Sequence, residues 1–447
     1  MKHIQTLLIL ALLSMAGFAQ DDDTPRIGTF DMGILHNTQD LMVQRVGTKF
    51  YRHGKPYYYV GANFWAAPIL ASEGQGGNRE RLCRELDRLQ ALGVSNLRIA
   101  VGADEGSRNV TSLTPCLQTR GGVLNDTLLR GLDYLLAELE NRDMVCVLYL
   151  TNSWDWSGGF GYYLRETGHG DSPDASGDGY NAYCAYASQF YADSAAVSLY
   201  HKHVRRIVSR RNTVTGRLYR DEPAIMSWQL CNEPRPFSRE RFTDMLRWSR
   251  QTARLIKSID PNHLVSTGSE GTIGCLYDAG VCEQMHADPD IDYLTVHIWP
   301  VNWGWASRDR LREALPNVYL KATEYMEDNL RVAEAIGKPL VIEEFGYSRD
   351  NNLYNPEART TSRDAFYDFV FSQVEDSHRE GGSVAGCNFW AWGGEGRAQG
   401  ERWHMGDDLL GDPPHEPQGW YSVFDTDETT LRLIRQTNEH LSARNDE

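Results

Sequence analysis

Two glutamates of this chain stand at the ends of apolar, strand-like runs, where the chain turns into a loop. Glu233 follows the run 224–230, and Glu344 ends the run 339–344. A carboxylate at the mouth of a buried strand costs free energy unless it is paired or used. Two such carboxylates facing one cleft have the chemistry to cleave a glycosidic bond, one donating a proton and the other attacking carbon.

Each glutamate alone also fits a structural acid in a salt bridge, but the two contexts together favour a catalytic pair. Arg98 ends an earlier apolar run and is expected to point at Glu344, which would keep that carboxylate ionised. We therefore predict that Glu344 is the nucleophile and Glu233 the acid/base, with the higher pKa, about 5–5.5 Å away. Strand alternation would turn Glu343 to the opposite face, toward a helix.

These side chains can face one cleft only if the carboxyl ends of their strands lie close together. Eight short apolar segments have the composition of strands covered on both faces; they span residues 57–63, 96–101, 144–150, 224–230, 263–268, 293–298, 339–344 and 386–391. Helical patterns alternate with them, at residues 79–92, 128–141, 182–210, 238–258, 321–336, 362–379 and 428–443. This order predicts an α/β fold, a (β/α)₈ TIM barrel with its site at the strand ends. A doubly wound sheet is the alternative, but its glycine-rich phosphate loop is missing from the sequence.

Composition and the N-terminus set the class of protein. The chain has 447 residues and a formal net charge of −16, which disfavours binding to nucleic acid or anionic membranes. Residues 1–19 have the pattern of a signal peptide, and 20–43 are predicted to be a flexible segment before a single catalytic domain at 44–447. No further apolar run is long enough to cross a bilayer. We expect a secreted or periplasmic protein without a membrane anchor.

The cysteines and histidines give no metal-binding pattern. Eight cysteines occur without a Cys-x-x-Cys pair, and no His-x-x-x-His pair is present. Cys275 and Cys282 are spaced so that a disulfide would close a small loop, which the sequence does not decide. We predict that neither a metal nor a cofactor takes part.

With these residues in hand, the chain resembles glycoside hydrolase family 5, and within it the endo-β-1,4-mannanases. Asn232-Glu233-Pro234 is similar to the acid/base motif of that family, and Glu344-Phe345-Gly346 to its nucleophile motif. The likeness covers essentially the whole mature chain. It implies a (β/α)₈ barrel and hydrolysis with net retention.

The resemblance also implies substrate-binding residues at strand ends or in the loops that follow: Arg98, Asn152, Trp154, Asn232, Arg235, His297, Trp299 and Trp390. Arg235 would contact the leaving-group side or pair with a neighbouring acid, and His297 would contact substrate or stay in the core. Trp299 departs from a tyrosine that donates to the nucleophile in many members. Trp65, after the first strand, either lines the bottom of the cleft or packs in the barrel core. The run 157–181 is an insertion whose role the sequence does not indicate.

The expected function is retaining, endo-acting cleavage of β-1,4-mannosidic bonds by double displacement. The partners would be β-mannan polysaccharides and oligosaccharides, including glucomannan and galactomannan. Two alternatives within the family are an exo-acting mannobiohydrolase, which needs a loop blocking one end of the cleft, and a β-1,4-glucanase. A more distant alternative is a barrel that binds carbohydrate without catalysis.

Overall fold

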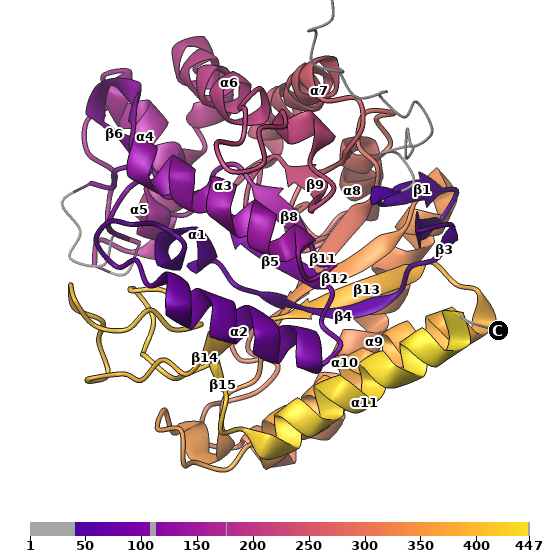
Figure 1. The fold of residues 1–447 in the computed structure, drawn as a ribbon. Coiled ribbons are helices and arrows are strands. Elements are labelled where there is room, and N and C mark those ends of the chain that lie inside the picture. The colour runs from indigo at the N-terminus through magenta and orange to yellow at the C-terminus, as the bar shows by residue number, and fades with distance from the viewer. Residues whose placement is uncertain (1–40, 108–112, 176, 446–447) are drawn as a thin grey trace, which may run out of the picture. The chain divides into compact units, whose positions relative to one another are not determined.

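The computed structural model describes residues 41–107, 113–175 and 177–445. Its main sheet has eight parallel strands in the order β10-β9-β8-β5-β4-β13-β12-β11 (Figure 1). They are β4 (Tyr59–Asn63), β5 (Asn96–Ala100), β8 (Val145–Tyr149), β9 (Ile225–Gln229), β10 (Leu264–Ser266), β11 (Leu294–Ile298), β12 (Leu340–Phe345) and β13 (Val384–Phe389). A bridge between Ser266 and Tyr293 joins the two edge strands, so the sheet closes as a (β/α)₈ barrel, as predicted.

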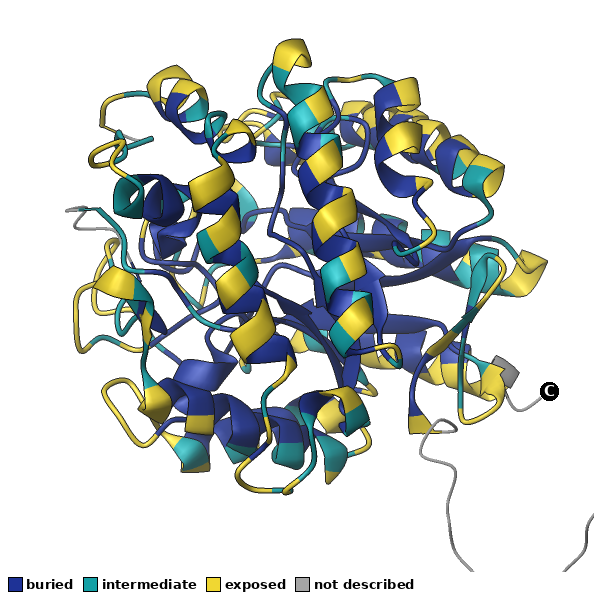
Figure 2. Ribbon diagram, turned by 90° about the horizontal axis from the view of Figure 1, so that it is seen from above, coloured by how far each residue is buried: buried dark blue, intermediate teal, exposed yellow. Residues whose placement is uncertain are grey.

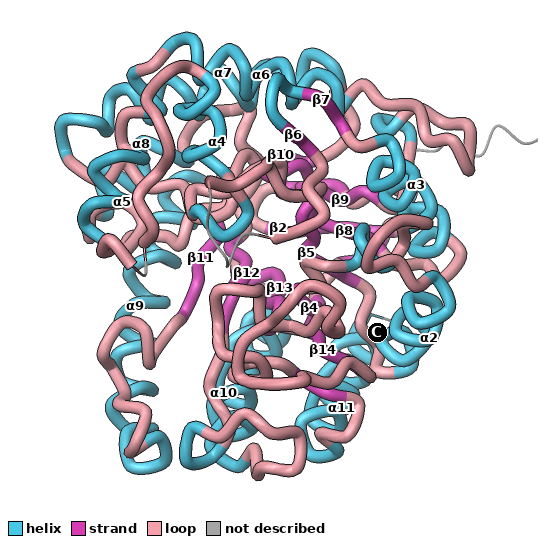
Figure 3. Tube along the Cα trace, turned by 90° about the vertical axis from the view of Figure 1, so that its left-hand side faces the viewer, coloured by secondary structure: helices cyan, strands magenta, loops and turns pink. Residues whose placement is uncertain are grey.

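Helices surround the strands, as the tube in Figure 3 makes clear. They are α1 (Ala67–Leu70), α2 (Arg79–Ala91), α3 (Asp126–Glu140), α4 (Gly159–Glu166), α5 (Tyr180–Ala187), α6 (Ser194–Val208), α7 (Phe242–Ile259), α8 (Ala279–His286), α9 (Leu311–Ile336), α10 (Thr361–Glu380) and α11 (Glu428–Asn445). The strands are buried throughout, whereas the helices expose one side to solvent (Figure 2). This is the burial pattern of a parallel sheet covered by helices.

Local sequence signals set the helix ends. Asn78 and Asn125 accept hydrogen bonds from first-turn backbone N–H groups and so begin α2 and α3. Gly337 and Gly381 end α9 and α10 in left-handed backbone conformations that glycine adopts without strain. The predicted helix 182–210 is two helices, because Asp193 caps a new one at Ser194. Helix α9 begins ten residues before the expected start, and α1, α4 and α8 were not predicted.

A small antiparallel sheet closes the amino-terminal end of the barrel. It contains β1 (Gln44–Val46), β2 (Lys49–Arg52) and β3 (Lys55–Pro56), in that order. Phe50 is fully buried with its ring 5.3 Å from that of Tyr293, and Val43 joins the same cluster. Met42 and Val43, the last two residues of the predicted flexible segment 20–43, are both buried, and residues 20–40 of that segment lie outside the described residues. The predicted signal peptide lies outside the described residues.

Two further strand pairs lie outside the barrel: β6 (Gln118–Thr119) with β7 (Val123–Leu124), and β14 (Trp392–Gly394) with β15 (Val423–Phe424). The second pair forms the base of the long loop that follows the barrel strand β13. Across the described ranges, no helix combines the length and apolar character that crossing a membrane requires.

Candidate active site

Glu233 is held in an unusual backbone conformation just beyond β9. Its φ angle is 50°, in the left-handed region that glutamate seldom adopts. Its N–H donates to the Gly268 carbonyl at 2.9 Å, and its carbonyl accepts from Ser153 Oγ at 2.6 Å. Neighbouring loops therefore hold the strain, as often happens at functional sites.

Glu344 lies on β12 against the fully buried guanidinium of Arg98, as expected. Nη1 of Arg98 donates to Glu344 Oε1 in a short, charge-assisted hydrogen bond. Nη2 of Arg98 donates to Asn232 Oδ1 at 2.7 Å, and Asn232 donates onward to Asn152 Oδ1 at 3.1 Å. Arg98 thus joins the nucleophile candidate to the residue beside the acid/base candidate.

His297, on β11, lies between the two glutamates. Its Nδ1 is 2.7 Å from Glu233 Oε1 and 3.2 Å from Glu344 Oε2, and one carboxylate oxygen of Glu233 lies within 4.8 Å of one of Glu344. That spacing fits a retaining pair, for which about 5–5.5 Å is typical. It would leave too little room for the water that an inverting enzyme places between its carboxyl groups.

The charges place the proton of this trio on His297. Burial alone would lower the pKa of His297, but the carboxylates of Glu344 and Glu233 raise it to about 10. Burial alone would raise the pKa of Glu233, but the hydrogen bond and charge of His297, together with Arg235, lower it to about 2. The expectation that Glu233 has a raised pKa is therefore wrong for this state, because the sequence does not reveal that His297 contacts both acids.

Strand alternation predicted that Glu343 would face a helix, and this prediction is wrong. In the pairing of β11 with β12, Val296 lies opposite Ile342 and His297 opposite Glu344, so Glu343 is the extra residue of a bulge. A bulge turns two successive side chains toward the same side. Glu343 is fully buried, with its Oε2 at 3.4 Å from Arg98 Nε.

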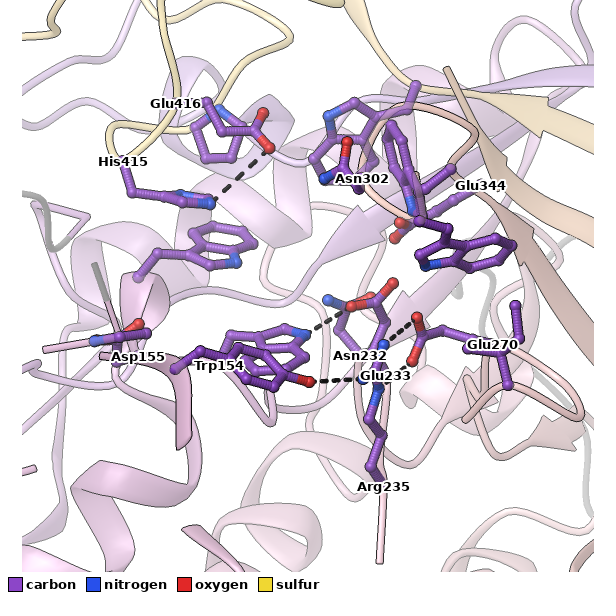
Figure 4. A pocket seen from close by; sticks show the side chains of 18 of the residues that line it. Trp154, Asp155, Asn232, Glu233, Arg235, Glu270, Asn302, Glu344, His415 and Glu416 are labelled. Atoms are coloured by element: carbon purple, nitrogen blue, oxygen red, sulfur yellow. Dashed lines mark hydrogen bonds and ion pairs between the residues drawn. The ribbon is translucent and has the colours of Figure 1, made fainter. Parts of the chain in front are cut away.

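A pocket of about 650 Å³ opens above the two glutamates (Figure 4). Its lining combines aromatic rings with charged and amide groups: Trp154, Asp155, Trp156, Ala175, Tyr180, Asn232, Glu233, Arg235, Glu270, Ile273, Tyr277, Trp299, Asn302, Trp303, Trp305, Glu344, Trp390, Pro413, His415 and Glu416. Apolar ring faces beside hydrogen-bonding groups suit a ligand with flat apolar patches and hydroxyl edges.

The predicted binding residues fall into three groups. Those that line the pocket are Trp154, Asn232, Arg235, Trp299 and Trp390. Arg98, Asn152 and His297 are buried beneath it and hold the lining residues in place. Trp65 is not part of the lining: its Nε1 donates to the Gly411 carbonyl at 2.8 Å, and Trp156 lies against its edge.

Arg235 and Glu270 form a buried ion pair at one side of the pocket. Two guanidinium nitrogens of Arg235 donate to the two carboxylate oxygens of Glu270. A third donates to Tyr180 Oη at 2.7 Å, and the guanidinium lies over the ring of Trp154. Trp154 in turn donates from Nε1 to Glu233 Oε2 at 2.6 Å. Arg235 thus forms an ion pair with a neighbouring acid and also lines the pocket. Its contact with substrate stays a prediction.

Sequence reasoning missed Glu270 and Tyr180 as pocket residues. Glu270 follows the fifth barrel strand within Ser269-Glu270-Gly271, so its place after a strand was a usable signal. Tyr180 begins α5 at the end of the 157–181 insertion, which therefore contributes to the pocket. No local pattern distinguishes Tyr180 from an ordinary surface tyrosine.

The opposite side of the pocket is formed by the loop between β14 and β15. His415 stacks on Trp156 with ring centroids 5.6 Å apart, and its Nε2 lies 3.9 Å from Glu416 Oε1. Figure 4 shows this pair across the pocket from Arg235 and Glu270. Burial, together with nearby carboxylates including Glu344, raises the pKa of Glu416. His415 and Glu416 thus add polar groups to this side of the pocket lining.

Two clusters of described residues bring possible metal ligands within 4.8 Å of one another. One is the trio Glu233, His297 and Glu344, whose atoms already hydrogen-bond to each other. The other is Cys275, Cys282 and His286, in which Nδ1 of His286 lies 2.8 Å from the Cys282 carbonyl and Nε2 2.8 Å from Thr267 Oγ1. These existing bonds occupy both nitrogens of His286. That the reaction needs no metal stays a prediction.

Known proteins resemble this chain over most of its length. The family model described as GH family 5 beta-mannosidase-like matches residues 40–446. Mannan endo-1,4-beta-mannosidase 1 of Arabidopsis thaliana is 30% identical over 361 residues, which cover 78% of this chain and 81% of that protein.

Solved structures share the architecture. The family 5 mannosidase of Rhizomucor miehei, in complex with mannosyl-fructose, matches with a TM-score of 0.84 at 33% identity, covering 91% of this chain and 99% of its own. The endo-beta-1,4-mannanase of Thermotoga petrophila has the same fold, with a TM-score of 0.64 at 24% identity over 87% of this chain and 77% of its own.

Proposed function

The chain belongs to the β-mannosidase-like group of glycoside hydrolase family 5, and from this premise we propose that it hydrolyses β-1,4-mannosidic bonds with net retention. The observation that carries the proposal is the pair Glu233 and Glu344, with carboxylate oxygens within 4.8 Å above a pocket lined by aromatic rings. The substrates are β-mannan polysaccharides and oligosaccharides.

The mechanism follows from the positions of the three titratable groups. Glu344, held by Arg98, attacks the anomeric carbon while Glu233 protonates the departing oxygen. The proton comes from His297 Nδ1, which lies 2.7 Å from Glu233 Oε1. A mannosyl ester of Glu344 forms, and Glu233, now ionised, takes a proton from the water that hydrolyses the ester.

Variants of the two glutamates test these roles. Glu344→Ala removes the nucleophile and is expected to lower kcat on mannan by several orders of magnitude while binding of mannooligosaccharide persists. Trp303→Phe is the matched control, because it keeps an aromatic ring in the same pocket at a position that packs against Trp305 and Tyr325. Near-full turnover by Glu344→Ala and by Glu233→Ala would contradict both assignments.

The position of cleavage along the chain is the finer question. We propose endo action first, as in the names of the curated plant relatives. Exo action is the second candidate, because it needs a loop across the cleft and the loop between β14 and β15 contributes His415 and Glu416 to the pocket lining. Product sizing on mannohexaose separates them: endo action yields mixed internal fragments early, whereas exo action releases one short product from the start.

Mannan and glucan differ at each sugar only by the orientation of the 2-hydroxyl. Preference for mannan is expected, and a parallel assay on carboxymethylcellulose tests the glucanase alternative. A carbohydrate-binding barrel without catalysis would bind mannan without releasing reducing ends.

We propose further that the protein is exported. The apolar run after Lys2 and the small residues Gly17 and Ala19 support a cleaved signal peptide. Amino-terminal sequencing of protein recovered from outside the cytoplasm tests this, and an intact Met1 there would contradict it.

A further inference from the structure

Glu343, immediately before the nucleophile candidate, is a buried carboxylate that the mechanism above does not use. It is 0% exposed, and the bulge in β12 turns it toward the inside of the barrel beside Glu344. A carboxylate buried in this way is costly unless a cation or hydrogen-bond donors compensate it.

Its surroundings supply that compensation on one oxygen. Gln229 donates from Nε2 to Glu343 Oε2 at 2.6 Å, and Arg98 Nε lies 3.4 Å from the same atom. Gln229 also accepts from Arg98 Nε at 2.9 Å through its own Oε1, which fixes the direction of its amide. Glu343 Oε1 is buried without a hydrogen-bond partner among the described residues.

Arg98 therefore faces two carboxylates, through Nη1 to Glu344 and through Nε to Glu343. The titratable and charged groups around Glu343 come from four strands and the residue before one of them: Arg98 on β5, Glu344 on β12, His297 on β11, Tyr59 on β4, and Tyr293 just before β11. Burial raises the pKa of Glu343, while Arg98, His297 and Gln229 oppose that change. Burial also raises the pKa values of both tyrosines, so they stay neutral.

We propose that Glu343 is a positioning residue for the reaction, because its negative charge offsets the positive charge of Arg98. Arg98 then holds Glu344 less tightly, which leaves Glu344 able to attack. The same negative charge keeps the proton bound that His297 and Glu233 share. This inference rests on the proposed function. Without the charge on Glu343, the positive charge of Arg98 would act undivided on Glu344, and protons on the neighbouring groups would be lost more easily.

The test compares the pH profiles of kcat/KM for the wild type and Glu343→Gln. A like charge within a few ångströms typically moves a pKa by about one unit or more. Loss of the charge should therefore shift both limbs of the profile to lower pH by about one unit. The acid limb moves because less negative charge surrounds the catalytic site, and the alkaline limb moves because the His297–Glu233 pair loses its proton more easily. Glu343→Asp keeps the charge and should keep the limbs in place, even if the rate falls.

A folded Glu343→Gln whose profile is only scaled down, with both limbs unmoved, would overturn the proposal and show that Glu343 is neutral or merely structural. If Glu343→Gln does not fold, Glu343→Ser, which leaves room for water, carries the same expectation. Wild-type turnover on mannan tests the proposed function by itself, so its failure is distinct from an unchanged profile in the variants.

Discussion

At the scale of residues, the charge of the active site depends on one proton on His297, which lies between two glutamates. His297 contacts Glu233 and Glu344 at once, and the raised pKa of His297 and the lowered pKa of Glu233 are two sides of the same interaction. Titrations of groups this close belong to the cluster rather than to any one member. A site in this state can deliver a proton to Glu233 over a single hydrogen bond.

This interaction predicts how stability depends on pH. The pKa of His297 rises from 6.5 to about 10 on folding, so its stabilising contribution is full below pH 6.5 and is lost as pH rises through about 10. The pKa of Glu233 falls from 4.5 to about 2, so its contribution is full above pH 4.5 and is lost as pH falls toward about 2. His297→Asn should therefore cost most between pH 4.5 and 6.5.

Urea unfolding of the wild type and His297→Asn at pH 5.5 and 9.5 measures this. The difference in free energy of unfolding should be clearly smaller at the higher pH. Asn keeps a donor at this position, so the hydrogen bond is partly matched and the charge is what changes. An equal difference at the two pH values would mean that His297 is neutral in the folded protein.

At the scale of elements, a glutamate on α2 anchors the loop that contributes His415 and Glu416 to the pocket lining. Glu85 is fully buried and accepts from Trp392 Nε1 at 3.1 Å and from the Glu395 N–H at 2.8 Å. Gly394 lies between these two residues with φ of 55°, and a Cβ built there would fall 2.1 Å from Glu85 Oε2. Only glycine fits so close to the carboxylate.

Gly394→Ala is expected to lower the free energy of unfolding by about 1–3 kcal/mol, a typical cost of overpacking. It should also raise KM, since His415 and Glu416 belong to the loop that starts here. Gly400→Ala is the control, because a Cβ at that position of the same loop meets no atom within 4 Å. Chemical denaturation and steady-state kinetics measure both effects; a silent Gly394→Ala would refute the anchoring role of Glu85.

At the scale of the whole molecule, the barrel separates stability from catalysis. The amino-terminal end is plugged by the β1–β3 sheet, with Phe50 inside a cluster that includes Val145, Met226 and Val341. The opposite, carboxyl end of the strands holds the glutamates and the pocket. Residues at the plug therefore contribute packing without touching the reaction.

Phe50→Ala is expected to lower the free energy of unfolding by about 3–5 kcal/mol, the usual cost of removing a buried aromatic ring. The kcat of the folded protein should stay near that of the wild type, measured well below the melting temperature. Val46→Ala, at a position that is 61% exposed in the same small sheet, should change neither quantity. A large fall in kcat of folded Phe50→Ala would mean that the two ends are coupled.

Much of this molecule could be read from local patterns in its sequence. All eight barrel strands lie where short apolar runs were found, because burial on both faces leaves that composition in the chain itself. Glu233, Glu344 and Arg98 were recognisable for the same reason: a charged residue at the end of an apolar run stands out. Helix ends were less accurate where a cap such as Asp193 divides a continuous pattern.

The remaining features depend on contacts between distant segments, which only the tertiary structure decides. The inward turn of Glu343 follows from the register of β12 against β11, and a bulge has no signature in one strand alone. The proton on His297 and the pairing of Arg235 with Glu270 arise because three-dimensional proximity, not spacing along the chain, sets electrostatic energies. The sequence by itself determined which residues are equipped for chemistry, and the closed barrel decided which of them share charge, protons and space.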